Sequence, residues 1–170
     1  KKKYDISTNK KKIRTIIFIK NKLKKIKKRE REKILNIIKK KLNITNSKLF
    51  LSQNYKTLNW SEVKKIDKNK KYEIGGHSTN HEILSFLNET ELKIEIDQCI
   101  NVLEKKLKRK IDLFSYPEGK FNNFVIKKLK KKKIKICPTA TPGINTKKVS
   151  SFHLKRYMPG FMNQNFPFKI

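Results

Sequence analysis

Short β-prone runs alternate with helical patterns along this chain, and that alternation restricts the fold more than any other feature. The strand candidates are residues 71–74, 111–116, 134–137 and 152–157, with a further short one at 4–7. Between them, apolar residues recur every three or four positions, which is the spacing of a helix with one buried face. Because strands that alternate with helices favour a parallel sheet or barrel, the sequence predicts an α/β fold.

Asparagines mark the predicted starts of three helices, since their side chains can cap a helix N-terminus. These starts are Asn59 with Glu62, Asn88 with Glu91, and Asn122 or Asn123. The helix that follows Asn88 is predicted to bury a stripe made of Leu92, Ile96, Cys99, Leu103 and Leu107. Two lysine-rich helical runs precede all of these within residues 9–45, and their lysines are expected to face solvent.

The charge of the chain raises the question of nucleic-acid binding. At 170 residues it has the length of one domain, yet its net charge is +31. Only five of the 45 basic residues are arginine, the residue best suited to phosphate forks and base edges. The lysines are spread through every segment and form no single patch. We therefore expect no specific nucleic-acid partner, and a basic nucleic-acid-binding protein is the weakest of three alternatives.

The cysteines and the apolar runs carry little information about location. Cys99 and Cys137 form no metal-binding or disulfide pattern, and both are expected to lie in the core. The longest apolar run near the start, residues 16–19, is too short to span a membrane or to form a signal-peptide core. The sequence thus predicts no transmembrane segment and determines neither the compartment nor the oligomeric state.

Two of the three histidines, His77 and His81, lie within residues 72–81, just after a strand candidate. Imidazole is the commonest protein ligand for zinc-like metals, and residues four apart share one face of a helical turn. Gly75 and Gly76 would let the backbone turn sharply from strand to helix. A metal site and a surface helix start with two solvated histidines both fit this spacing.

The segment 117–119 also follows a strand candidate. In parallel α/β folds, ligands gather at the carboxyl ends of the strands. We therefore expect this segment to lie beside the two histidines.

Taken in order, these motifs resemble the polysaccharide deacetylases of carbohydrate esterase family 4, the NodB-homology domain. The resemblance covers residues 58–157, and the ordered set is far more specific than any single motif. It consists of Leu58-Asn-Trp60, Glu73-Ile-Gly-Gly-His-Ser-Thr-Asn-His81, Phe114-Ser-Tyr-Pro-Glu-Gly119, Thr141-Pro-Gly143 and Leu154-Lys-Arg156. The resemblance favours a metal role for His77 and His81 over the alternative of solvated histidines.

The resemblance implies a distorted (β/α) barrel of mostly parallel strands, which holds a divalent ion, often zinc, through two histidines and one aspartate. In the family, that aspartate and the catalytic base belong to a Thr-Phe-Asp-Asp-Gly segment on the first strand. No such segment occurs here, so we expect it upstream of Lys1. Residues 1–170 are then a single N-terminally truncated catalytic domain with an incomplete barrel and a helical insertion at 9–45. Asp5 is not expected to replace the missing aspartate.

The implied reaction is hydrolysis of an N-acetyl or O-acetyl group on a carbohydrate polymer or oligosaccharide. By resemblance, the metal polarises the acetyl carbonyl and acidifies a bound water, and a main-chain N–H near Glu118 helps to hold the oxyanion. The implied substrate and oxyanion residues are Tyr116, Pro117, Glu118, Gly119 and Arg156. Ser78 is expected to support the histidines by hydrogen bonding, or to cap a helix.

Two positions depart from the family pattern. Ser115 stands where the family has arginine, and Arg156 stands where it has the catalytic-acid histidine. Arginine cannot donate a proton near neutral pH, so Arg156 is expected to bind a substrate anion or to stabilise charge. His153 is close in sequence, but strand alternation places it on the other face from Arg156, and it is not expected to be the acid.

The leading interpretation is an enzyme, the C-terminal part of a metal-dependent carbohydrate deacetylase, with this chain alone expected to be inactive. The runner-up is a carbohydrate-binding module that keeps the fold without turnover. The upstream sequence separates the two, because the Asp-Asp motif is either present there or absent. The sugar polymer and the acetyl linkage are not determined by the sequence.

Overall fold

The computed structural model describes residues 3–26, 28–44 and 57–157. The chain divides into two compact units, Lys1–Thr57 and Leu58–Ile170, and each has its own internal packing. None of the helices within the described ranges has the length and apolar character needed to cross a membrane. The interpretation of the whole chain as one truncated catalytic domain stays a prediction.

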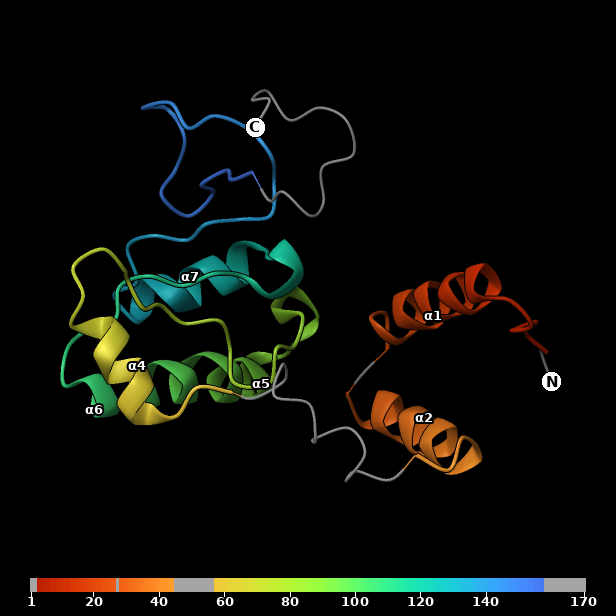
Figure 1. Ribbon diagram of the computed structural model, residues 1–170. Coiled ribbons are helices and arrows are strands. Elements are labelled where there is room, and N and C mark those ends of the chain that lie inside the picture. Colours follow the sequence, from red (N-terminus) through yellow and green to blue (C-terminus); the bar gives the residue numbers. More distant parts are fainter. Residues whose placement is uncertain (1–2, 27, 45–56, 158–170) are drawn as a thin grey trace. The chain divides into compact units, whose positions relative to one another are not determined.

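The first unit contains two helices, α1 (Asn9–Leu23) and α2 (Lys28–Lys41), which confirms the two predicted helical runs (Figure 1). The strand predicted at 4–7 is wrong. The Asp5 carboxylate accepts hydrogen bonds from the main-chain N–H of Ser7 and from Nζ of Lys11, so the segment turns directly into α1. Thr8 then caps that helix by accepting from the N–H of Lys11.

The second unit consists of short helices joined by extended segments. Its elements are α4 (Trp60–Asp67), η2 (Leu84–Phe86), α5 (Glu89–Leu92), η3 (Lys93–Gln98), α6 (Cys99–Leu107), η4 (Pro117–Gly119) and α7 (Asn123–Lys131). The three predicted helix starts are confirmed. Asn59 and Asn88 form capping boxes with Glu62 and Glu91, and the side chain of Asn122 accepts from the N–H of Val125.

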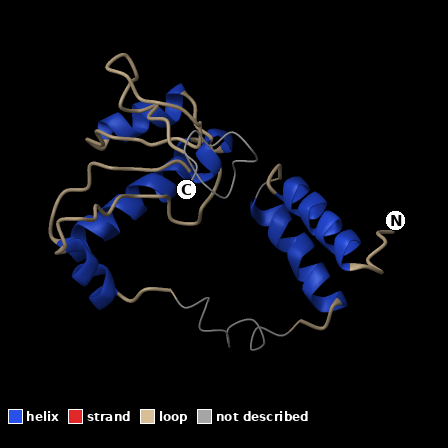
Figure 2. Ribbon diagram, turned by 45° about the horizontal axis from the view of Figure 1, so that its top comes forward, coloured by secondary structure: helices blue, strands red, loops and turns tan. Residues whose placement is uncertain are grey.

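The extended segments run parallel to one another, as the alternation of strands and helices predicts. Parallel bridges join Gly76 to Phe114, Leu113 to Ile136, and Pro138 to Leu154. None of these contacts grows beyond a single bridge within the described ranges, and Figure 2 accordingly draws no strand there. The described part of the chain therefore shows parallel α/β pairing, and the distorted barrel that the resemblance implies stays a prediction.

Proline and glycine explain why the pairing stays short. Pro138 has no N–H to continue a ladder, and Pro117 ends the segment that contains Phe114. In the segment that pairs with Phe114, Gly75 and Gly76 offer no side chain to pack on the neighbouring segment. These residues limit each contact to a few main-chain hydrogen bonds.

The core of the second unit lies between α7 and the continuous helix formed by α5, η3 and α6 (Figures 1 and 2). Lys128 of α7 pairs with Asp97, and Lys132 donates to Asn101 of α6, which ties the two helices together. The fully or largely buried apolar side chains are Leu84, Leu92, Ile96, Ile100, Ile111, Phe114, Tyr116, Val125, Ile126, Leu129, Ile134, Cys137 and Phe152.

The predicted buried stripe of the long helix needs one correction. Leu92 and Ile96 are buried, and so is Ile100, which the prediction omitted, whereas Cys99 is only half-buried and packs against the core. Residues of η3 form a π-helix, which is wider than an α-helix and changes the direction in which the following side chains point. Leu103 and Leu107 pack against the core as predicted, and Cys137 is buried.

Gly75 and Gly76 are required by close packing, contrary to the expectation that they provide a sharp turn. The glycines with positive φ among the described residues are Gly119 and Gly143. A Cβ on Gly75 would lie 2.7 Å from the carbonyl oxygen of Leu113, and one on Gly76 would lie 2.6 Å from the ring of Phe114. The neighbouring segment thus approaches the backbone too closely for any side chain.

We expect Gly75→Ala to lower the free energy of unfolding by about 1–3 kcal/mol, because the added Cβ would meet the Leu113 carbonyl oxygen as well as its side chain, and the main-chain oxygen cannot rotate away. Urea denaturation followed by circular dichroism measures the change. Ser61→Ala, at an exposed position of α4, is the control and should shift stability by less than about 0.5 kcal/mol. A Gly75→Ala protein as stable as the parent would show that the two segments are not in contact.

Candidate active site

The histidine loop, defined as residues 77–81, follows the bridge between Gly76 and Phe114. It is not helical, so the expected helical turn is wrong. Two of its residues, Ser78 (φ 66°) and His81 (φ 56°), lie in the left-handed region, which costs a non-glycine residue about 1–3 kcal/mol. The two histidines nevertheless come together, with ring centroids 4.8 Å apart and ring planes at 73°.

His77 is oriented by a hydrogen bond to the neighbouring segment. Its Nδ1 lies 2.7 Å from the carbonyl oxygen of Ser115. Since a carbonyl oxygen only accepts, Nδ1 carries the proton and donates, which leaves the lone pair of Nε2 for another partner. Metal-binding histidines typically donate their second ring nitrogen in this way.

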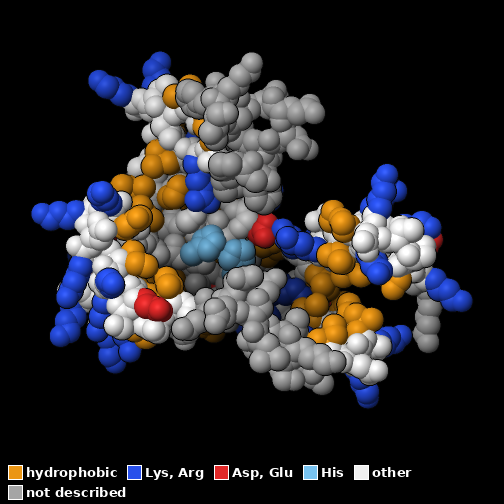
Figure 3. Space-filling view, in the orientation of Figure 1, with side chains coloured by type: hydrophobic (Ala, Val, Ile, Leu, Met, Phe, Trp, Pro, Cys, Tyr) orange, Lys and Arg blue, Asp and Glu red, His pale blue; other side chains and the backbone are white. Residues whose placement is uncertain are grey.

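Both histidine side chains are exposed, and Figure 3 shows imidazoles at an accessible surface of the protein. A water-soluble ligand therefore has access to the rings. Within the described residues, no group of three or more histidine, cysteine, aspartate or glutamate side chains is placed to hold a metal ion. The donor set among the described residues therefore fits two positions of a zinc-type site but not a complete one.

The loop rests on the π-helical segment η3, a contact that the sequence analysis missed. The side chain of Glu95 accepts from the main chain and the side chain of Asn80, and the main chain of Glu95 accepts from Thr79. Only 4% of the Glu95 surface is exposed. The sequence signal that could have indicated its burial is helical spacing, because Glu95 lies three residues after Leu92 and four before Cys99, on the face predicted to be buried.

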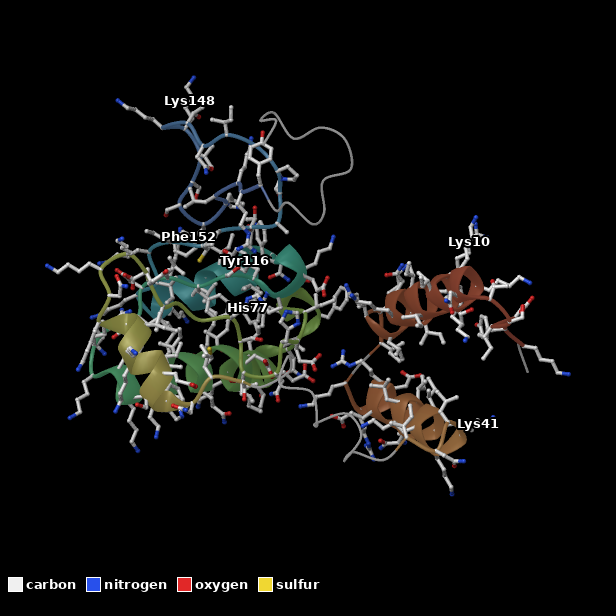
Figure 4. The ribbon with its side chains drawn as sticks, in the orientation of Figure 1. Lys10, Lys41, His77, Tyr116, Lys148 and Phe152 are labelled. Carbon is white, nitrogen blue, oxygen red and sulfur yellow. The ribbon has the colours of Figure 1, made fainter. Side chains whose placement is uncertain are left out.

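The short helix η4 lies directly beside the histidine loop, which confirms the predicted neighbourhood. Ser115 donates its N–H to the carbonyl of Gly76 at 2.8 Å and accepts from His77, and η4 starts two residues later. Figure 4 labels His77 and Tyr116 on these two neighbouring segments. Within η4, Glu118 has φ 54°, so the turn is built on a left-handed non-glycine residue.

Tyr116 and Pro117 do not present side chains to a substrate. Tyr116 is fully buried, stacks on Phe121 at a centroid distance of 4.5 Å, and donates its hydroxyl to the carbonyl of Phe152. Burial raises the pKa of its phenol, with a further contribution from Cys137. Pro117 is also buried, whereas the Glu118 side chain is exposed. From this turn, Glu118 and main-chain groups remain candidates for substrate contact.

The segment that contains Arg156 and His153 is held by main-chain bonds. Arg156 donates its N–H to the carbonyl of Thr141, and its Nε is buried with no hydrogen-bond partner in the described part of the chain. The ring of His153 packs edge-on against Phe121 at 5.0 Å. An anion-binding role for Arg156 stays a prediction, as does the exclusion of His153 as the acid.

The expected support from Ser78 is not found. Its Oγ is buried, and no hydrogen-bond partner for it occurs among the residues that the structure describes. It also caps no helix, because none begins in the loop. Thr79 and Asn80 make the stabilising bonds instead, since their donors point toward η3.

The model of the polysaccharide deacetylase family matches residues 8–137. The chain belongs to this family, which confirms the resemblance seen in the motifs. No curated protein sequence matches it.

Solved structures of deacetylases have a similar fold. They include a Streptococcus pyogenes deacetylase, PplD, in complex with acetate (TM-score 0.57, 19% identity, 61% of this chain and 46% of that one). The BpsB deacetylase domain of Bordetella bronchiseptica (TM-score 0.55, 16% identity) matches over 58% of this chain and 48% of its own. A Bacillus cereus polysaccharide deacetylase (TM-score 0.53, 21% identity) matches over 61% and 33%. The chain thus spans less than half of each of these structures.

Proposed function

We propose that this chain supplies the two histidine ligands of a metal-dependent site that removes acetyl groups from a carbohydrate. Membership of the polysaccharide deacetylase family supports the reaction class. The observation that carries the proposal is the pairing of the His77 and His81 rings 4.8 Å apart, with Nδ1 of His77 bonded to Ser115. This arrangement directs Nε2 of His77 away from the protein backbone and makes the ring a rigid ligand.

Zinc is the metal of choice for two neutral imidazoles. When bound, such an ion supplies Lewis-acid polarisation of the acetyl carbonyl and a more acidic water. The protein's own part is to hold both rings at fixed separation and to keep Nδ1 of His77 protonated through the Ser115 carbonyl. The third ligand and the general base are not found among the described residues.

The turn at η4 is the proposed position of the acyl group. It follows Ser115, whose carbonyl holds His77, so its main chain lies next to the proposed metal position. By family resemblance, the main-chain N–H near Glu118 donates to the oxyanion. Arg156, which is half-buried and whose Nε has no hydrogen-bond partner in the described part, is the candidate for contact with an anionic group of the substrate.

The proposal is tested on the product of the whole reading frame that contains this chain, with acetylated chito-oligosaccharides as substrate. We expect zinc-stimulated acetate release, and a loss of at least about 100-fold when His77 or His81 is replaced by alanine, a loss comparable to the removal of a catalytic group. His153→Ala is the matched control, because that ring packs on Phe121, and it should retain activity.

Undiminished acetate release in the His77→Ala and His81→Ala proteins would refute the proposal. Binding of the oligosaccharide with no acetate release by any form of the protein would instead favour the carbohydrate-binding module. A steep loss of nucleic-acid affinity with added salt would be the signature of the third alternative, the basic nucleic-acid-binding protein.

A further inference from the structure

The histidine loop has a conformation that its own sequence does not favour. Ser78 and His81 are both in the left-handed region although neither is glycine. The backbone between them must therefore be held by contacts from outside the loop. Those contacts come from one helix, through η3 and the first residue of α6.

Glu95 makes the central contact. One carboxylate oxygen accepts from the main-chain N–H of Asn80 at 2.8 Å, and the other accepts from Nδ2 of the same residue at 2.7 Å. Asn80 directly precedes His81, so this pair of bonds determines where the backbone of His81 begins. A carboxylate engaged at both oxygens restricts rotation as well as position.

The main chain of η3 makes further contacts with the loop. The N–H of Cys99 donates to the carbonyl of Ile96, and the carbonyl of Glu95 accepts from the N–H of Thr79 at 3.1 Å. The hydroxyl of Thr79 donates to the carbonyl of Ile94.

Cys99 contacts the other end of the loop. Burial raises the pKa of its thiol, while hydrogen bonds from the main-chain N–H groups of His77 and Ser78 lower it. The same helix therefore contacts both ends of the loop. Cys99 contacts His77 and Ser78, and Glu95 contacts Asn80, which precedes His81. Both ends of the loop, where the two histidines lie, are therefore held against one helix.

Burial of Glu95 needs a reason beyond packing. Its surface is 4% exposed, and burying a carboxylate is unfavourable unless its oxygens are hydrogen-bonded. The partners that the structure shows are amide groups of Asn80, where a lysine or arginine would be the usual choice for a buried carboxylate. The buried carboxylate of Glu95 therefore serves to hold Asn80 of the loop.

We infer that Glu95 is a positioning residue, whose carboxylate fixes Asn80 and thereby sets the separation of the His77 and His81 rings for metal binding. The inference rests on the proposed function of the two histidines. It assigns Glu95 no contact with substrate or metal.

The test is Glu95→Gln in the 170-residue chain, because glutamine keeps the shape but offers one acceptor oxygen where Asn80 needs two. We expect the zinc affinity, measured by isothermal titration calorimetry, to fall roughly 10–100-fold, the usual effect of losing an outer hydrogen-bond partner. Asn80→Ala, at an exposed position where folding is not at risk, should weaken zinc binding in the same direction.

Asp97→Asn is the matched control. Asp97 lies two residues away in the same π-helical segment, but its carboxylate pairs with Lys128 of α7. It should leave the zinc affinity within about threefold of the parent, below the range expected for an outer partner of a ligand. Urea denaturation identifies any variant whose loss of zinc binding reflects unfolding.

A second readout separates this inference from the proposed function. In the metal-free protein, nuclear Overhauser contacts between the His77 and His81 rings report their separation directly. These contacts should be present in the parent and in Asp97→Asn, and lost in Glu95→Gln while the core methyl spectrum is unchanged. Failure of the parent to bind zinc would overturn the proposed metal site alone, and persistence of the ring contacts in Glu95→Gln would overturn the role of Glu95.

Discussion

Replacing either His77 or His81 by alanine is expected to reduce the zinc affinity of the 170-residue chain by more than about 100-fold. Each ring is one of the two candidate ligands brought together among the described residues, with centroids 4.8 Å apart. One remaining neutral imidazole on an exposed loop does not retain a divalent ion against water. Competition with a chromophoric chelator measures the affinities.

His153→Ala serves as the control for these measurements, because it removes the third histidine without touching the loop. Its zinc affinity should equal that of the parent. If His77→Ala and His81→Ala bind zinc as well as the parent does, the ion lies elsewhere and the rings are solvated, which is the plainer interpretation of their spacing.

The second large effect concerns turnover. With zinc added, the 170-residue chain is expected to release acetate roughly 10²–10⁴-fold more slowly than a version extended upstream, the usual contribution of a general base. The physical reason is the donor set, since two imidazoles come together without a third ligand in the described part of the chain. Two neutral ligands also leave the charge of the ion uncompensated.

The decisive assay compares both proteins on the same acetylated oligosaccharide at saturating zinc. Asp5→Asn belongs in the comparison, because Asp5 is the aspartate near the start of the chain that was considered as a replacement for the missing family aspartate. Its carboxylate accepts from Lys11 and Ser7, and these hydrogen bonds lower its pKa, so it is already engaged locally. Equal and robust turnover by the short and extended proteins would mean that this chain carries its own base and third ligand.

Features that depend on near neighbours could be predicted from the amino-acid sequence. Capping boxes at Asn59 and Asn88 act over three residues, so their side chains alone define those helix starts. The parallel order of the extended segments followed from their alternation with helices. The ordered motifs likewise identified the family, because they combine many positions along the chain.

The geometry of the candidate site depends on contacts between segments that are distant in sequence. The spacing of His77 and His81 suggested a helical turn, but the loop takes left-handed conformations that contacts from η3 must hold. Tyr116 was a substrate candidate by motif, and packing against Phe121 and Phe152 places it in the core. Gly75 is needed because Leu113, 38 positions further along the chain, approaches its backbone. Such requirements come from segments distant in sequence, and no local pattern encodes them.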